Sequence, residues 1–139
     1  MELTAVALQT VAENQNVVFT DVAVCGCPSI IHRNGSGLIT LRGLTNQCRA
    51  RFKVSFGGNI AIPTGGTVGA ISLAISIDGE PLGSTIMIET PAAVEEFNNV
   101  FSAVYVDIPR CCCSTIGIKN VSDQAINVQN ANLIVERVA

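Results

Sequence analysis

Alternation between apolar and polar side chains is the feature of this sequence that most limits its fold. In segment 49–57 apolar residues hold the even positions up to Phe56, and basic or hydroxyl residues hold the odd positions up to Ser55. Segment 71–77, ISLAISI, repeats the pattern with small residues on its polar side. A period of two residues is typical of a half-buried β-strand. No long window has the 3.6-residue period of a helix, and at most one helical turn is expected, within residues 91–97.

Turn signals separate short strands along the whole chain. Asp78-Gly79 follows segment 71–77 and predicts a tight hairpin. The return strand is expected over 84–90, and other strands over 3–8, 17–24, 30–33, 38–42, 100–108, 115–119 and 126–138, the last broken near Asn130. About eight to ten short antiparallel strands without helices between them predict an all-β fold, a jelly roll or β-sandwich. Because residues 12–16 are polar, we divide the chain into an N-terminal strand or arm, 1–16, and a jelly-roll domain, 17–139.

Composition favours a domain that packs against other subunits. Hydrophobic residues make up 48% of the chain and charged residues only 14%, so few charged side chains are available to cover the surface. The net charge of −3 argues against binding to nucleic acid, and the basic residues of segment 49–53 are expected on the solvated face of a strand. The N-terminus lacks the basic region of a secretory signal, and no apolar stretch reaches membrane-spanning length. We therefore expect cytoplasmic synthesis without a signal peptide, and neither a membrane nor a nucleic-acid partner.

Groups that could carry catalysis are scarce. His32 is the single histidine, too few for a jelly-roll metal site of two or three histidines, and no Gly-X-Ser-X-Gly elbow surrounds a serine. The glycine pairs lack the ending of a phosphate-binding loop. Glu95 and Glu96 could hold a cation together with Asp107 or Asp78, but no EF-hand spacing supports this and a solvated loop is favoured. We expect no enzyme activity and no catalytic, cofactor-binding or metal-binding residues.

Six cysteines are the most unusual feature of the composition. They fall in three places and are candidate disulfide cysteines: Cys25, Cys27, Cys48, Cys111, Cys112 and Cys113. Buried free thiols and a zinc site are alternatives, although the spacing is poor for zinc. Because the cysteines lie in segments bounded by glycine and proline, we favour disulfides, formed once the protein meets an oxidising exterior. The preferred link joins the loop of Cys25 and Cys27 to that of residues 111–113.

Four segments, taken in order along the chain, resemble the trimeric jelly-roll heads of the tumour-necrosis-factor and complement type. The resemblance is closest to the heads of collagen-like proteins of bacterial spore surfaces. The segments are GLITL at 37–41, ARFKVSF at 50–56, LAISIDGEPL at 73–82 and ANLIVERV at 131–138. The likeness spans residues 35–139, but this chain has no collagen repeat, fewer aromatic residues, and cysteines in the loops that connect its strands.

As a whole, the sequence also resembles small virion proteins of bacteriophages and prophages of gut Firmicutes. This resemblance implies a virion surface protein, either a capsid decoration (cement) protein or a head-fibre component. Such a protein would assemble as a homotrimer and contact the major capsid protein or other virion proteins. The alternative is a trimeric head or filament subunit on a bacterial or spore surface, acting in adhesion through a glycan or receptor. The absence of tryptophan and the single tyrosine argue against glycan binding.

Overall fold

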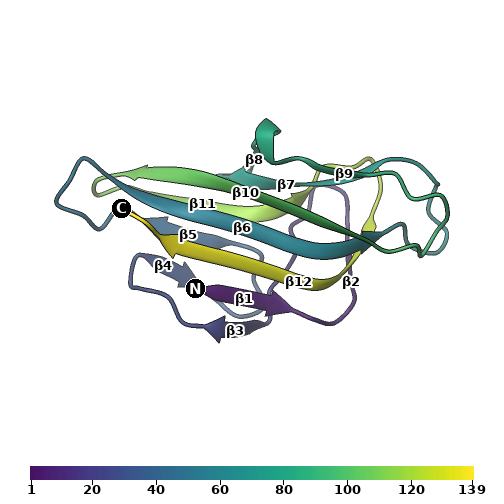
Figure 1. Ribbon diagram of the computed structural model, residues 1–139, viewed down its shortest axis with the longest axis horizontal. Coiled ribbons are helices and arrows are strands. Elements are labelled where there is room, and N and C mark those ends of the chain that lie inside the picture. The colour runs from purple at the N-terminus through teal and green to yellow at the C-terminus, as the bar shows by residue number, and fades with distance from the viewer.

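Two antiparallel sheets stacked face to face form the protein in the computed structural model, which describes residues 1–139 (Figure 1). Sheet A contains, in order across the sheet, β10 (Asn98–Pro109), β6 (Arg49–Ala61), β12 (Ile126–Arg137), β1 (Glu2–Ala5) and β3 (Asp21–Val24), and β2 (Gln9–Val11) pairs with β12. Sheet B contains β4 (Ile30–His32), β5 (Ile39–Arg42), β11 (Cys113–Asn120), β7 (Ile71–Ile77) and β8 (Glu80–Pro81), and β9 (Met87–Glu89) pairs with β7. The predicted all-β jelly-roll sandwich is confirmed.

The core lies between the sheets, and the alternation of the sequence determines which side chains reach it. Along β6 the even-numbered residues, Phe52 and Phe56 among them, are buried, while the odd-numbered residues from Arg49 to Asn59 face outward. The rings of Phe19 and Phe56 meet edge to face with their centroids 6.4 Å apart. Inward-facing isoleucines and leucines of β5, β7 and β11 close the core from sheet B. The hydrophobic effect acting on this one shared core therefore fixes the stacking of the sheets.

Two locally encoded features appear as the sequence predicts. Asp78 and Gly79 both have positive φ, 51° and 87°, which is the type I′ geometry of a two-residue hairpin joining β7 to β8. The expected break in the last strand is a register shift in β12 between Gln129 and Asn132, where Asn130 has φ 56°.

Elsewhere the strands are more numerous than expected, twelve in all; β6, β10 and β11 extend beyond the expected ranges, whereas β1, β3 and β9 are shorter. The expected strand over 84–90 contains only β9, because Thr85 lies in a 3₁₀ turn, η1 (Gly83–Thr85), where its hydroxyl contacts the main chain of Ile75. Within the expected strand 17–24 only β3 is a strand, since residues 17–20 cross between the sheets and bury Val17 and Phe19. Residues 91–97 contain no helical turn. No helix in the structure is long and apolar enough to span a membrane.

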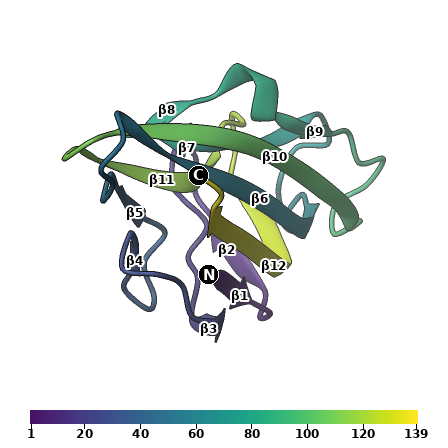
Figure 2. The same cartoon turned by 60° about the vertical axis from the view of Figure 1, so that its left-hand side comes forward.

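The N-terminal residues are an integral part of sheet A. β1 lies between β12 and β3, pairs with both, and buries Leu3 completely (Figure 2). β2 pairs with the start of β12. The expected arm, residues 1–16, thus packs on its own chain.

Candidate functional site

The single histidine has the surroundings of a residue that closes a strand end. His32 is the last residue of β4, and its Nε2 lies 2.9 Å from the carbonyl oxygen of Ser36. Its Nδ1 is buried without a hydrogen-bond partner. No hydrogen bond joins the ring to a serine, threonine or cysteine side chain, so the arrangement contains no activated nucleophile.

The carboxylates considered as cation ligands are each engaged separately. Glu95 accepts a hydrogen bond from the hydroxyl of Thr64 at 2.6 Å, and Glu96 accepts one from the main chain of its own loop. Asp78 accepts from the main-chain N–H of Thr115 at 2.9 Å, at the β7–β8 turn. No group of three or more histidine, cysteine or acidic residues is arranged to hold a metal ion.

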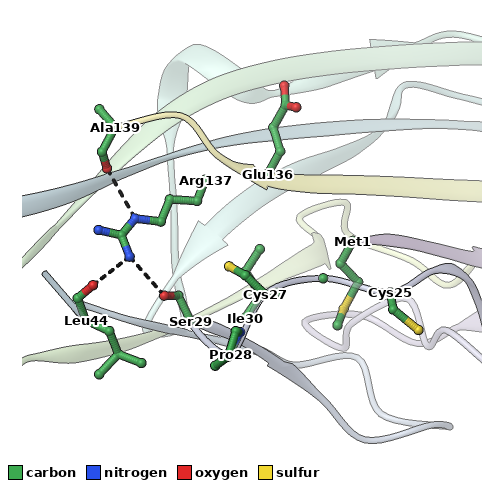
Figure 3. Close-up of a pocket in the computed structure, with 11 residues that line it drawn as sticks. Met1, Cys25, Cys27, Pro28, Ser29, Ile30, Leu44, Glu136, Arg137 and Ala139 are labelled. Atoms are coloured by element: carbon green, nitrogen blue, oxygen red, sulfur yellow. Dashed lines mark hydrogen bonds between the residues drawn. The ribbon is translucent and has the colours of Figure 1, made fainter.

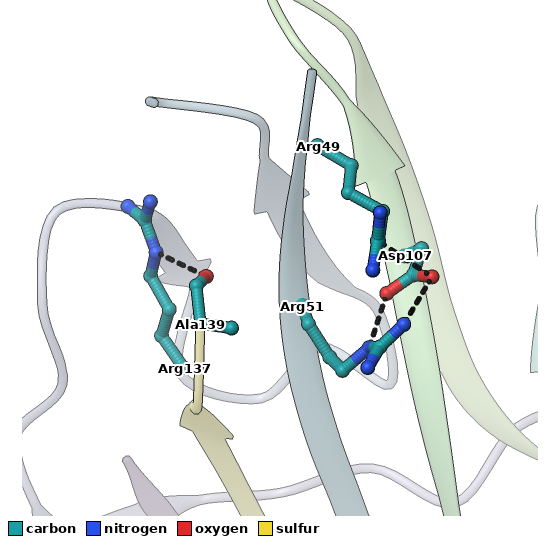
Figure 4. A network of polar contacts seen from close by, with 5 residues as sticks. All are labelled: Arg49, Arg51, Asp107, Arg137 and Ala139. Atoms are coloured by element: carbon teal, nitrogen blue, oxygen red, sulfur yellow. Dashed lines mark hydrogen bonds and ion pairs between the residues drawn. The ribbon is translucent and has the colours of Figure 1, made fainter. Parts of the chain in front are cut away.

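Asp107 is the centre of an exposed ion-pair network on the outer face of sheet A (Figure 4). Arg51 donates two hydrogen bonds to its carboxylate, at 2.8 and 3.0 Å, and Arg49 lies 3.1 Å away. The hydrogen bond from Arg51 is the main cause that lowers the pKa of Asp107; desolvation opposes it, and the positive charges of Arg51 and Arg49 lower the pKa further. The same contacts raise the pKa of Arg51. The basic residues predicted on a solvated strand face are thus partly neutralised by the neighbouring strand.

Beside this network, β10 presents two large aromatic side chains to solvent. Phe101 is 66% exposed and Tyr105 is 62% exposed, and both lie on the outer side of the strand, as does Ala103 between them. Across the ladder, Phe101 faces Gly57 and Ala103 faces Ser55. We call these five residues the β10 face. The side chain of Phe101 lies over Gly57, whereas the residue opposite Tyr105 is Lys53.

The β10 face lies at an edge of sheet A, beside a set of charged side chains. β10 pairs only with β6 in sheet A, so one edge of this twelve-residue strand has no hydrogen-bonded neighbour. The outer face of the sheet carries three basic side chains on β6; across the ladders Asp107 of β10 faces Arg51, and Glu136 of β12 faces Lys53. Basic side chains on this face are thus paired with carboxylates of the neighbouring strands.

All six candidate disulfide cysteines lie at one end of the sandwich, where both chain termini also lie (Figures 1 and 2). They belong to the β3–β4 loop, the β5–β6 loop and the β10–β11 turn, except that Cys113 begins β11. Every one is exposed and unpaired. The sequence indicated loop positions for them but not that these loops share one end of the fold. The predicted link from the loop of Cys25 and Cys27 to the turn at 111–113 stays a prediction.

An open pocket of about 710 Å³ lies beside the β3–β4 loop (Figure 3). Its wall includes Cys25, Cys27 and Arg137. The guanidinium of Arg137 donates to the carbonyl oxygen of Leu44 at 2.6 Å and to the hydroxyl of Ser29 at 3.2 Å, so it tethers two loops. Much of its hydrogen-bonding capacity is therefore used within the protein.

No protein-family model and no curated protein matches this chain. Among solved structures, it is similar to the globular domain of zebrafish complement 1qA, with a TM-score of 0.63 and 11% identity over 96% of this chain and 93% of that one. It aligns less well with the C-terminal domain of EclA, described as a sugar-binding protein, at a TM-score of 0.44 and 13% identity over 95% and 79% of the two chains. At identities this low the likeness concerns the fold alone. The chain has the jelly-roll fold of the complement globular domain, which confirms the resemblance to complement-type heads at that level.

Proposed function

We propose that this chain is a non-catalytic structural domain that assembles as a homotrimer and forms part of the surface of a bacteriophage particle, as a capsid decoration or head-fibre protein. The observation that carries the proposal is the β10 face, with Phe101 and Tyr105 about two-thirds exposed next to an unpaired strand edge. Large aromatic side chains grouped on one surface are typical of residues that become buried on association.

A second copy of the chain is the occupant that the surface fits best. The small residues beside Phe101 let another subunit approach closely, and the opposite charges that pair across sheet A reduce the repulsion between identical faces. Closed rotational symmetry would also cover the free edge of β10 in every subunit. The number three comes from the resemblance to complement-type and tumour-necrosis-factor-type heads, and the shared jelly-roll fold supports it.

A structural rather than catalytic role agrees with the way the titratable groups are used. The only histidine contacts a main-chain carbonyl, while Glu95, Asp78 and Asp107 bind to a hydroxyl, to main chain and to arginine. None of these four residues lines the open pocket beside the β3–β4 loop. Their contacts suit a role in holding the fold together.

The particle is proposed from the overall resemblance to small virion proteins, and its test is direct. Mass spectrometry of purified particles, released from an induced lysogen that encodes the chain, should find the protein in stoichiometric amounts. Washing with high salt should leave it on the particle, together with the major capsid protein. Particles that lack the chain would overturn the virion role and leave trimer formation untouched.

The second candidate function is a trimeric head on a bacterial or spore surface that binds a glycan or receptor. The open pocket beside the β3–β4 loop favours this ligand-binding function, because small ligands usually bind in concave sites lined by several apolar residues. Glycan-array binding by a trimer that is absent from purified particles would support this alternative. A trimer that binds no glycan and occurs in particles supports the first proposal.

A further inference from the structure

The β5–β6 loop and the β10–β11 turn are joined by main-chain hydrogen bonds. The ladder between β6 and β10 continues beyond its last strand pair, since the N–H of Arg110 donates to the carbonyl oxygen of Cys48 at 3.0 Å. The N–H of Gly43 donates to the oxygen of Cys112 at 2.8 Å, and the N–H of Cys111 donates to the oxygen of Gly43 at 3.1 Å. Four of the six cysteines, Cys48 and residues 111–113, therefore lie on these two connected segments, which we call the rim.

A close approach holds this rim in place. A Cβ atom added to Gly43 would lie only 2.1 Å from the carbonyl oxygen of Pro109, so a side chain cannot be accommodated there. The turn itself closes through a hydrogen bond of 3.0 Å from the N–H of Cys112 to the same carbonyl oxygen. Cys111 has φ 63°, in the left-handed region that non-glycine residues seldom occupy. The cysteine triplet is thus presented by a fixed turn, with all three side chains exposed.

The triplet directly continues the strand that carries the aromatic pair. From Tyr105 on the β10 face the chain runs four residues to the end of β10, about 13 Å at the rise of an extended strand, and then enters the turn. If β10 strands meet around a three-fold axis, their ends and the triplets at those ends lie around the same axis. Cys25, in contrast, follows β3, which is four strands away across sheet A, about 19 Å.

We propose that residues 111–113 of the three subunits form intersubunit disulfides around this axis, locking the trimer covalently after it leaves a reducing compartment. The inference rests on the proposed trimer. The number of cysteines in each subunit's triplet supports the disulfide lock. One cysteine per subunit could link only two of the three chains, whereas two or more per subunit allow each chain to bond to both neighbours. The triplet supplies enough thiols to close a ring of three chains.

The chemistry requires an oxidant, and a low-molecular-weight disulfide of the oxidised-glutathione class supplies it. A thiolate of one subunit attacks this disulfide, forms a mixed disulfide and releases one small thiol. A thiolate of the neighbouring subunit then attacks the mixed disulfide and releases the second small thiol. The two protein thiols lose two electrons and two protons, and the small disulfide gains them. Cytosolic reductants would keep the triplet reduced until the particle is released.

The test compares the purified full chain, treated with oxidised glutathione, with two matched serine variants. On denaturing, non-reducing gels the wild type should run as a covalent trimer that reducing agent converts to monomer. Substituting serine at 111–113 should leave only monomer, whereas Cys25→Ser with Cys27→Ser should still give the covalent trimer. A variant that keeps only Cys112 of the triplet, and also carries Cys48→Ser, should stop at a covalent dimer.

Two results would overturn the inference. One is an oxidised wild type that stays monomeric on denaturing gels, including a chain whose thiols have paired internally. The other is a covalent trimer that persists when serine replaces residues 111–113. Light scattering in reducing buffer separates this inference from the proposed function. A non-covalent trimer without cross-links refutes only the disulfide lock, whereas a reduced monomer refutes the trimer itself.

Discussion

Replacing Phe101 with serine should dissociate the trimer. The side chain is 66% exposed in the isolated chain, so about 130 Å² of a ring surface of about 200 Å² is available for burial. At about 25 cal/mol per Å² this corresponds to about 3 kcal/mol for each subunit, or about a hundredfold in affinity at each interface. Because three interfaces change together, the variant should be monomeric at micromolar concentration. Tyr105→Ser should act in the same direction.

The matched control is Ile88→Ser, because Ile88 has the same 66% exposure but lies on β9 of sheet B. Light scattering over a dilution series measures the mass of each variant, and circular dichroism checks that the fold is retained. The control should remain trimeric. The reasoning is refuted if Phe101→Ser dissociates no more readily than the wild type, or if the Ile88 variant dissociates to the same extent.

Three further substitutions test other parts of the account. Gly43→Ala forces a Cβ against the oxygen of Pro109 and should lower the free energy of unfolding by about 1–3 kcal/mol in thermal denaturation, while Gly69→Ala, which meets no atom within 4 Å, should be nearly neutral. Asn120→Asp exchanges a buried amide that donates to three carbonyl oxygens for a carboxylate that cannot donate, and should cost about 3 kcal/mol or more in chemical denaturation; a wild-type unfolding curve would contradict this. Asp107→Asn leaves two arginines unneutralised and should weaken the trimer more at low salt than at high salt, as measured by sedimentation. In the wild type the Asp107 carboxylate should contribute to the free energy of unfolding at pH values above its ordinary pKa of about 3.9. This contribution should be lost as the pH falls through the lowered pKa, and the asparagine variant should lack that acid transition.

Features encoded by neighbouring residues could be predicted from the sequence. The alternation in β6 identifies its buried face, because the period of a strand is two residues wherever one side is buried. The hairpin could be predicted because Asp-Gly is a residue pair that readily adopts the positive φ that both positions have in the structure. The fold class required only these local signals, repeated along the chain.

The β10 face could not be predicted, because β10 is apolar on both of its sides. Valines and an isoleucine line the inner side, while Phe101 and Tyr105 occupy the outer side. Size and hydrophobicity alone would place the phenylalanine inside. Only the packing of β10 against the core, set by residues far away in the sequence, reveals that the aromatic residues are exposed. The gathering of the cysteines at one end has the same cause, because strand order brings their three loops together.

The mass of the reduced, full-length chain in solution tests the central claim most directly. Native mass spectrometry or light scattering in the presence of a thiol reductant removes any contribution from disulfides. The account predicts a stable complex of three chains of 14.5 kDa each, which persists on dilution to micromolar concentration. A reduced wild-type chain that is monomeric under these conditions would contradict it.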